Sequence, residues 1–155
     1  MSVALPTWSV DEYQAHVGAK IGVSKWFPVE QERINQFGAV TEDEQFIHVD
    51  EDRARDSEFG GTIAHGFLSL SLISAMAFSA APPIAGQRSA INYGFNAVRF
   101  LTPVRSGSRI RGHFVLKEIA ERGPNRWRTT FTVEVEIEGQ SKPALSCEWV
   151  MLTTT

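Results

Sequence analysis

The second half of the chain alternates apolar and polar residues with a period of two. From residue 127 to 138, tryptophan, phenylalanine, valine and isoleucine alternate with arginine, threonine and glutamate. This pattern predicts an antiparallel strand that has one face against a core and the other in water. The alternation returns in residues 145–151, and two earlier segments, 88–101 and 108–119, also fit strands.

The first half of the chain shows helical signals instead. Ser9 precedes acidic residues that suit the first turn of a short helix toward His16. Pro28 is a candidate start for a second helix, which continues with apolar residues at helical spacing. Asp50 is a candidate N-cap for a third, short helix, since acidic residues follow it first and basic residues later, an order that suits the helix dipole.

Between these two halves lies a strongly apolar segment. Residues Phe67 to Ala81 are apolar on every side, and Pro82 and Pro83 follow them. A helix that is apolar all round is a buried helix. We therefore expect an α+β fold in which an antiparallel sheet of about five strands wraps around one buried central helix, at about residues 66–81. No internal repeat or linker interrupts residues 1–155, so we expect a single domain.

Composition and charge exclude several classes of function. The chain has 155 residues, of which 43% are hydrophobic, enough for one domain with a core. Its net charge of −3 and the absence of a basic cluster argue against a nucleic-acid partner. One cysteine cannot form an internal disulfide, and the first residues lack the pattern of a secretory signal, so we expect a cytoplasmic protein. The longest apolar stretch is shorter than the ~20 residues of a membrane span, so we expect no membrane partner.

An acidic loop at residues 41–50, TEDEQFIHVD, encloses two apolar residues, Phe46 and Ile47. A charged segment that is fully exposed to solvent does not need apolar residues. We therefore expect a loop that these two residues fix to a core, while its polar groups face water, a metal, a substrate or a helix. A calcium loop needs a glycine and alternating oxygen ligands, which this loop lacks. The sequence has no HExxH motif, and Cys147 stands alone on the apolar face of its strand. We therefore expect neither a metal nor a reactive thiol.

Two side chains of this loop and one backbone position remain as candidates for chemistry. Asp43 and His48 belong to the residue types most often used to move protons near neutral pH. Gly66, in FGGTIAHGF, begins the apolar helix, where backbone N–H groups lack partners and can stabilise an oxyanion. On a regular strand, Asp43 and His48 would point to opposite faces, so they converge only if the loop turns sharply. The alternative is a helix-capping Asp43 and a half-buried His48 without a catalytic role.

Three motifs together resemble the MaoC-like, or R-specific enoyl-CoA hydratase, family. They are T-x-D-x-Q-F-I-H-V-D, F-G-G-T-I-A-H-G-F and the later INYGFNAVRFLTPVRSGSRIRG, which contains an R-F-x-x-P-V-x-x-G segment similar to that of the family. The Q-F-I-H form together with NYGFN looks closest to the nodulation-protein-N-like branch. The resemblance covers most of the chain from about Asn35 onward, and it implies the hot-dog fold.

The resemblance also implies an activity and a role for each candidate residue. Members of the family reversibly add water to a trans-2-enoyl thioester to give the (3R)-3-hydroxyacyl thioester. By resemblance, Asp43 and His48 would hold the water, and the N–H of Gly66 would polarise the thioester oxygen. Ser74 matches a family serine that hydrogen-bonds the catalytic aspartate, although a serine at this position can also bond back to its own helix.

The acidic loop departs from the commoner family pattern G-D-x-N-P-x-H at three positions. Glu42, Gln45 and Phe46 replace Gly, Asn and Pro, and Gln45 retains the amide, so we expect it to support the site. The expected substrate is an acyl-CoA or acyl-carrier-protein thioester, and we expect no cofactor. Two other functions stay open: a hot-dog acyl-CoA thioesterase, and a non-catalytic acyl-CoA-binding subunit.

The expected fold also suggests an oligomeric state. A sheet of about five strands leaves an edge strand whose unpaired N–H and C=O groups invite pairing with another copy. Family members that this chain resembles either dimerise or carry two such units in one polypeptide. We therefore expect a homodimer.

Overall fold

A single curved antiparallel sheet dominates the computed structural model, which describes residues 5–155. Six strands form it: β1 (Lys20–Val23), β2 (Phe27–Val29), β3 (Ser89–Phe100), β4 (Ser108–Glu121), β5 (Arg126–Ile137) and β6 (Leu145–Thr154). Their order is β1-β4-β5-β6-β3, and the short β2 also pairs with β4. The four long strands confirm the strands expected from alternation. The sheet thus has one strand more than the approximate number predicted.

The alternation of β5 explains where the core lies. Val133, Val135 and Ile137 are fully buried on the inner face of the sheet. On the outer face, Glu136 pairs with Arg111 of β4 at 2.6 Å. Burying one large aliphatic side chain contributes roughly 1.5–3 kcal/mol, so this one-sided pattern fixes which face of each strand meets the core.

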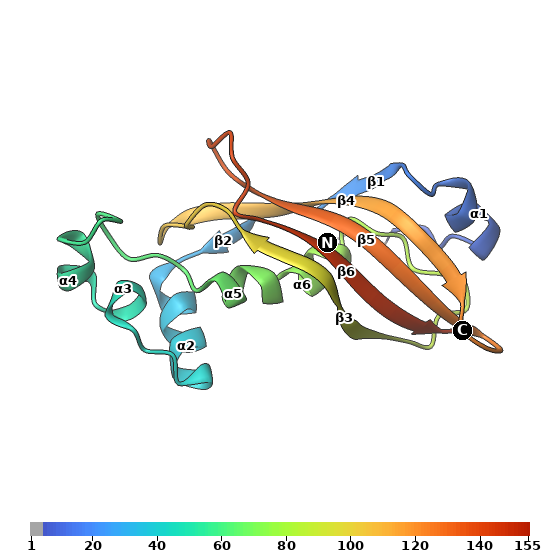
Figure 1. Ribbon diagram of the computed structural model, residues 1–155, viewed down its shortest axis with the longest axis horizontal. Helices are drawn as coiled ribbons and strands as arrows, with labels where there is room; N and C mark the ends of the chain where they lie inside the picture. The colour runs from blue at the N-terminus through green and yellow to red at the C-terminus, as the bar shows by residue number, and fades with distance from the viewer. Residues whose placement is uncertain (1–4) are drawn as a thin grey trace.

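Two helices, α5 (Gly66–Ser71) and α6 (Ile73–Ala77), lie end to end under the sheet (Figure 1). The prediction of one continuous helix at about residues 66–81 was wrong in this detail, because Leu72 separates the two helices and α6 ends at Ala77. Hydrogen bonds from Leu72 to Leu68 and from Met76 to Leu72 keep the helical course across the break.

The expectation that this segment is buried on all sides was also wrong. Ile73 and Met76 face the core and are essentially inaccessible, but Phe67 is 66% exposed and Phe78 is 83% exposed. Among residues 5–155, no element covers the side of α5 and α6 that carries these two phenylalanines. The apolar residues therefore form a core on one side of the helices and an open apolar face on the other.

The remaining helices confirm two predicted caps and correct one helix start. Ser9 forms a capping box with Glu12 at the start of α1 (Val10–Ala15), and Asp50 accepts a hydrogen bond from the Arg53 N–H at the start of α4 (Glu51–Arg55). Pro28 does not begin a helix: it lies in β2, and α2 (Gln31–Thr41) starts three residues later. Proline at the edge of a sheet is tolerated because no ladder hydrogen bond is lost there.

The α2–α4 segment extends beyond one end of the sheet and includes the short helix α3 (Phe46–Val49) (Figure 1). It carries the acidic loop toward the start of α5. Over residues 5–155, no helix combines the length and the apolar character that crossing a membrane requires.

Candidate active site

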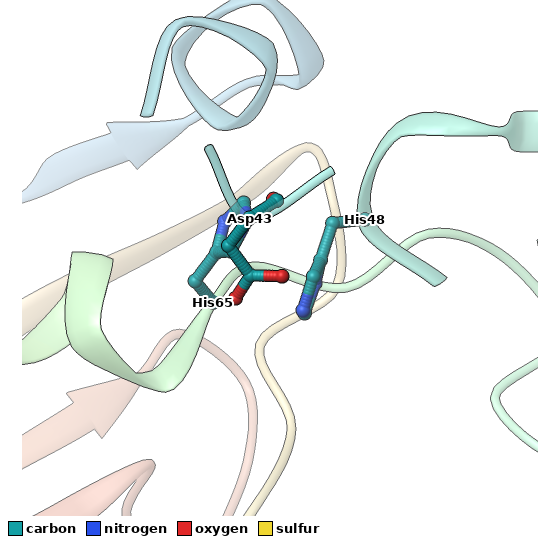
Figure 2. A group of neighbouring side chains, drawn as sticks. All are labelled: Asp43, His48 and His65. Atoms are coloured by element: carbon teal, nitrogen blue, oxygen red, sulfur yellow. The ribbon is translucent and has the colours of Figure 1, made fainter. Parts of the chain in front are cut away.

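The acidic loop turns sharply, and this turn brings Asp43 and His48 together. Glu42 ends α2 in the left-handed conformation, with φ 61°, and α3 then begins at Phe46. A carboxylate oxygen of Asp43 and one ring nitrogen each of His48 and His65 all lie within 4.8 Å of one another. Figure 2 shows the Asp43 carboxylate turned toward His48. The sharp turn that convergence requires is therefore present.

Hydrogen bonds fix the orientation of the His48 ring. Its Nδ1 lies 2.7 Å from the carbonyl of Ile63. A carbonyl can only accept, so Nδ1 carries the hydrogen and, in the neutral ring, Nε2 keeps a free lone pair. The His48 carbonyl in turn accepts from Gln31 Nε2 at 2.7 Å, and Gln31 Oε1 accepts from the Thr62 hydroxyl. Hydrogen bonds to both its ring and its backbone carbonyl therefore hold His48 in place.

The environment of His48 favours its neutral form. The side chain is buried, and this burial lowers the pKa of His48 below its ordinary value of 6.5. The hydrogen bond to Ile63 and the nearby Asp43 charge oppose this effect, while His65 adds to it. At neutral pH the Nε2 lone pair is thus available to accept a proton.

The apolar residues of the loop hold α3 in place, as expected of anchors. Phe46 and Ile47 are half-buried. The Ile47 carbonyl accepts a hydrogen bond from the Ile63 N–H at 3.0 Å, and the Arg53 guanidinium covers the Phe46 ring at 4.3 Å. This attachment ties α3 to the segment that precedes α5.

Gly66 lies beside His48 on the wall of one cavity. This cavity has a volume of about 540 Å³ and is mostly apolar, and Phe100, Leu101 and Thr102 also line it. A Cβ at Gly66 would lie 2.9 Å from the Phe100 ring, so the position has no room for a side chain. The N–H groups of Leu68 and Ser69 already donate to the His65 carbonyl, whereas Gly66 precedes these first helical hydrogen bonds and its N–H remains available.

Neither the Ser74 nor the Gln45 side chain contacts Asp43 or His48 through a hydrogen bond among the described residues. The Ser74 hydroxyl donates to Asn92 Oδ1 at 3.5 Å and lines a second, apolar cavity of about 460 Å³ next to Trp149. Ser74 follows Gly66 by eight positions, about 12 Å along a helix. The Gln45 side chain is exposed and makes no cap hydrogen bond. The supporting roles of both residues stay predictions.

Cys147 is buried in β6, as its place in the alternation predicted. It is the single cysteine of the sequence, and burial raises the pKa of its thiol to about 12. A thiol in this environment is inert.

Sequence reasoning missed two residues of the site. His65 is 2% exposed and stacks on His48, and its Nε2 donates to the Asp43 carbonyl. Gly38 lies buried in α2, where a Cβ would come within 3.0 Å of that same carbonyl. The H-G pair of the motif was a signal for His65, but the contact of Gly38 depends on a loop path that periodicity does not encode.

The group Asp43, His48 and His65 has the residue types of a metal site, but its geometry does not suit one. The two imidazole rings stack at 3.8 Å between centroids with an angle of 27° between planes. Their lone pairs lie in the ring planes and so run nearly side by side instead of converging on one ion. Each ring also has one nitrogen bound to a backbone carbonyl.

A comparison with known protein families decides the assignment of the chain. The family model described as MaoC like domain matches residues 12–138. The chain belongs to this family. Nodulation protein N from Rhizobium leguminosarum bv. viciae is 48% identical over 145 residues, covering 93% of this chain and 90% of the relative. The 3-hydroxyacyl-thioester dehydratase Z of Mycobacterium tuberculosis (strain ATCC 25618 / H37Rv) is 41% identical over 143 residues, covering 92% and 94%.

Solved structures of MaoC-like enzymes share the fold. The R-hydratase PhaJ1 from Pseudomonas aeruginosa aligns with a TM-score of 0.70 and 26% identity, covering 97% of this chain and 86% of that one. The fold is the hot-dog fold, as the family resemblance implied. The MaoC-like family and these relatives indicate an enzyme of the hydro-lyase kind.

One departure of this MaoC-like chain from the family pattern has a structural meaning. Glu42 stands where the commoner pattern has glycine, and it adopts the left-handed conformation with φ 61°. Glycine enters this conformation freely, whereas a residue with a Cβ does so at a cost of roughly 1–2 kcal/mol. The turn is therefore kept although the residue that favours it is absent.

Proposed function

We propose that the protein is an (R)-specific enoyl-CoA hydratase, or (3R)-hydroxyacyl-thioester dehydratase in the reverse direction. The observation that carries this proposal is the meeting of Asp43 and His48 beside the cavity that Gly66 lines. The names of the R-hydratase PhaJ1 and of the 3-hydroxyacyl-thioester dehydratase Z support it. The reaction adds one water across the C2–C3 double bond of a trans-2-enoyl thioester.

In this proposal, Asp43 and His48 hold the reacting water between them. The Asp43 carboxylate and the free Nε2 of His48 are both acceptors, so each can take one hydrogen of the same water. The water lone pair is then free to point toward C3. As the oxygen adds to C3, one group of this pair takes a proton from the water, and the pair then returns a proton to C2, so the substrate gains H and OH and both groups end as they began.

Gly66 stabilises the charge that develops during this step. Electrons from the double bond move toward the thioester oxygen, which becomes an oxyanion. The N–H of Gly66 lies at the start of α5, ahead of the first helical hydrogen bonds. In known enzymes, removing one donor aimed at a developing oxyanion costs about 2.7–4 kcal/mol of transition-state stabilisation.

The cavity composition favours an acyl thioester as the substrate, carried on CoA or on acyl-carrier protein. Two cavities, of about 540 and 460 Å³, are lined mainly by apolar side chains, and each contains a few polar groups. Apolar walls suit an acyl chain, and a small number of polar groups suits the reacting end.

We also propose that the working form is a homodimer that pairs through β3. Within residues 5–155, β6 is the single strand neighbour of β3. Ile91 and Tyr93 of β3 are exposed, and Phe67, Phe78, Phe100 and Leu101 add to the apolar surface nearby. An unpaired edge next to an exposed apolar face is a surface that a second copy can cover.

Steady-state assays with crotonyl-CoA test the proposed reaction. Hydration removes the absorbance of the conjugated double bond without releasing free thiol, and chiral analysis of the product should give the 3R isomer. Release of thiol would indicate a thioesterase and contradict the proposal. Binding of acyl-CoA without turnover on enoyl-CoAs of any chain length would indicate a non-catalytic subunit.

A further inference from the structure

The His65 side chain is enclosed on several sides by residues of the site. It is 2% exposed, and it is the residue before Gly66 at the start of α5. One face of its ring stacks on His48 at 3.8 Å between centroids. The Phe37 ring of α2 packs at 5.0 Å with a tilt of 54°. His65 thus contacts both the loop that carries the site and the helix that precedes it.

A hydrogen bond joins the edge of this ring to the backbone of Asp43. Nε2 of His65 lies 2.8 Å from the Asp43 carbonyl. The carbonyl can only accept, so the ring must carry its hydrogen on Nε2. Among the described residues, Nδ1 is buried and has no hydrogen-bond partner. A flip of the imidazole ring would therefore break its hydrogen bond to the Asp43 carbonyl.

Gly38 of α2 makes this contact possible. A Cβ at this position would lie 3.0 Å from the Asp43 carbonyl oxygen and 3.5 Å from Cε1 of His65. The backbone of α2 thus packs closely behind the hydrogen bond. The Asp43 carbonyl is held from one side by the His65 N–H and from the other by the helix.

We infer that His65 is a positioning residue for the hydration proposed above: it holds the Asp43 backbone through Nε2–H and the His48 ring through stacking. The inference rests on the proposed function for its effect on rate. His65 itself need not touch the substrate, because its two neighbours His48 and Gly66 line the cavity. One buried ring thereby fixes the distance between the carboxylate and the imidazole.

Two variants separate the two contacts of His65. His65→Phe keeps a ring against His48 but removes the donor to Asp43. His65→Gln keeps an N–H donor at a similar reach but removes the ring. Ile73→Val serves as the matched control, since Ile73 is buried in α6 outside the site and its truncation lowers stability without touching either contact.

The measurements are kcat and KM for crotonyl-CoA, and amide hydrogen exchange of residues 42–48. We expect His65→Phe to lower kcat at least about tenfold with KM within about threefold, because misplacement of the reacting groups acts on the chemical step. Exchange over residues 42–48 should be faster than in Ile73→Val. His65→Gln should recover part of the lost kcat, since it restores the bond to Asp43.

A His65→Phe variant with wild-type kcat, or with a loss no greater than that of Ile73→Val, overturns the inference. Failure of the proposed function itself has a different signature: the wild-type protein would not hydrate any enoyl thioester. In that case, amide hydrogen exchange alone tests whether His65 positions the loop. Faster exchange over residues 42–48 in His65→Phe than in Ile73→Val supports the positioning role, and equal exchange overturns it.

Discussion

At the scale of single residues, the chemistry depends on which nitrogen of His48 is free. The Ile63 carbonyl accepts a hydrogen bond from Nδ1–H, so Nε2 faces the site as an acceptor. Burial lowers the pKa of His48, so this acceptor persists to more acidic pH than in an ordinary histidine. The Asp43 carboxylate beside it supplies a second acceptor, and a single water can satisfy both.

This environment predicts a pH dependence for activity. If neutral His48 is required, kcat/KM should fall on the acid side with a midpoint below the ordinary histidine value of 6.5. The pH profile of crotonyl-CoA hydration measures this, and an acid limb with its midpoint above 6.5 would contradict the account.

The same lowered pKa predicts a pH dependence for stability. The unfolded chain binds a proton at His48 more readily than the folded protein does, so the contribution of His48 is fully present above the ordinary pKa of 6.5 and is lost at lower pH, as the pH falls through the lower pKa of the folded protein. Chemical denaturation of the wild-type and His48→Phe proteins should show a smaller slope with pH in the variant. Equal slopes would contradict this prediction.

The left-handed Glu42 predicts a gain in stability on mutation. Glu42→Gly should raise the free energy of unfolding by up to about 1 kcal/mol. Glycine removes a backbone strain of roughly 1–2 kcal/mol in the folded protein, but it also increases the conformational entropy of the unfolded chain, which offsets part of this gain. Activity should stay within about twofold, since the turn itself is unchanged.

Glu44→Gly is the matched control, because Glu44 is an exposed neighbour that is not in the left-handed region. It should lower stability slightly. Urea denaturation measures both variants. If Glu42→Gly is no more stable than Glu44→Gly, the strain at residue 42 is not significant.

At the scale of elements, the site depends on how closely α2 approaches the acidic loop. Gly38→Ala tests this approach. Alanine improves a helix by about 1 kcal/mol, but its Cβ would lie 3.0 Å from the Asp43 carbonyl oxygen. We expect the two effects partly to cancel in the thermal unfolding temperature, while the displaced loop lowers kcat at least about tenfold.

Ala39→Gly is the control for this variant. Ala39 is the exposed next residue of α2, so its replacement changes helix propensity by a similar amount without a contact to the loop. It should lower stability and leave kcat unchanged. A Gly38→Ala enzyme with wild-type kcat would show that the close approach is not required.

The long strands β4, β5 and β6 could be predicted from sequence because one-sided burial gives them a period of two, whereas the edge strand β3 is exposed along most of its length. The short β1 and β2 could not, since four and three residues contain too little of that period and their pairing with β4 decides their conformation. The break at Leu72 is equally local. The motif predicted that Asp43 and His48 belong together, but it did not predict the enclosing contacts of His65 and Gly38, which arise only when the loop folds back on α2.

At the scale of the whole molecule, the open apolar face of α5, α6 and β3 predicts self-association. We expect light scattering to give twice the chain mass of 17.2 kDa. Tyr93→Asp places a charge on the exposed edge strand β3 and should shift the protein toward the monomer with a loss of activity, because a buried unpaired charge is costly at an interface.

Val17→Lys is the control, since Val17 is an exposed apolar residue that precedes β1 at the opposite edge of the sheet. This variant should remain dimeric and active. A fully active wild-type species with the mass of one chain would contradict the dimer proposal.

The central claim is that Asp43 acts on the water that adds to the enoyl thioester. The most direct test compares the hydration of crotonyl-CoA by the wild-type and Asp43→Asn proteins, because asparagine keeps the shape of the side chain and removes its basicity. The account predicts a loss in kcat of about a hundred- to ten-thousand-fold with an unchanged thermal unfolding temperature. A variant that hydrates crotonyl-CoA at nearly the wild-type rate would contradict it.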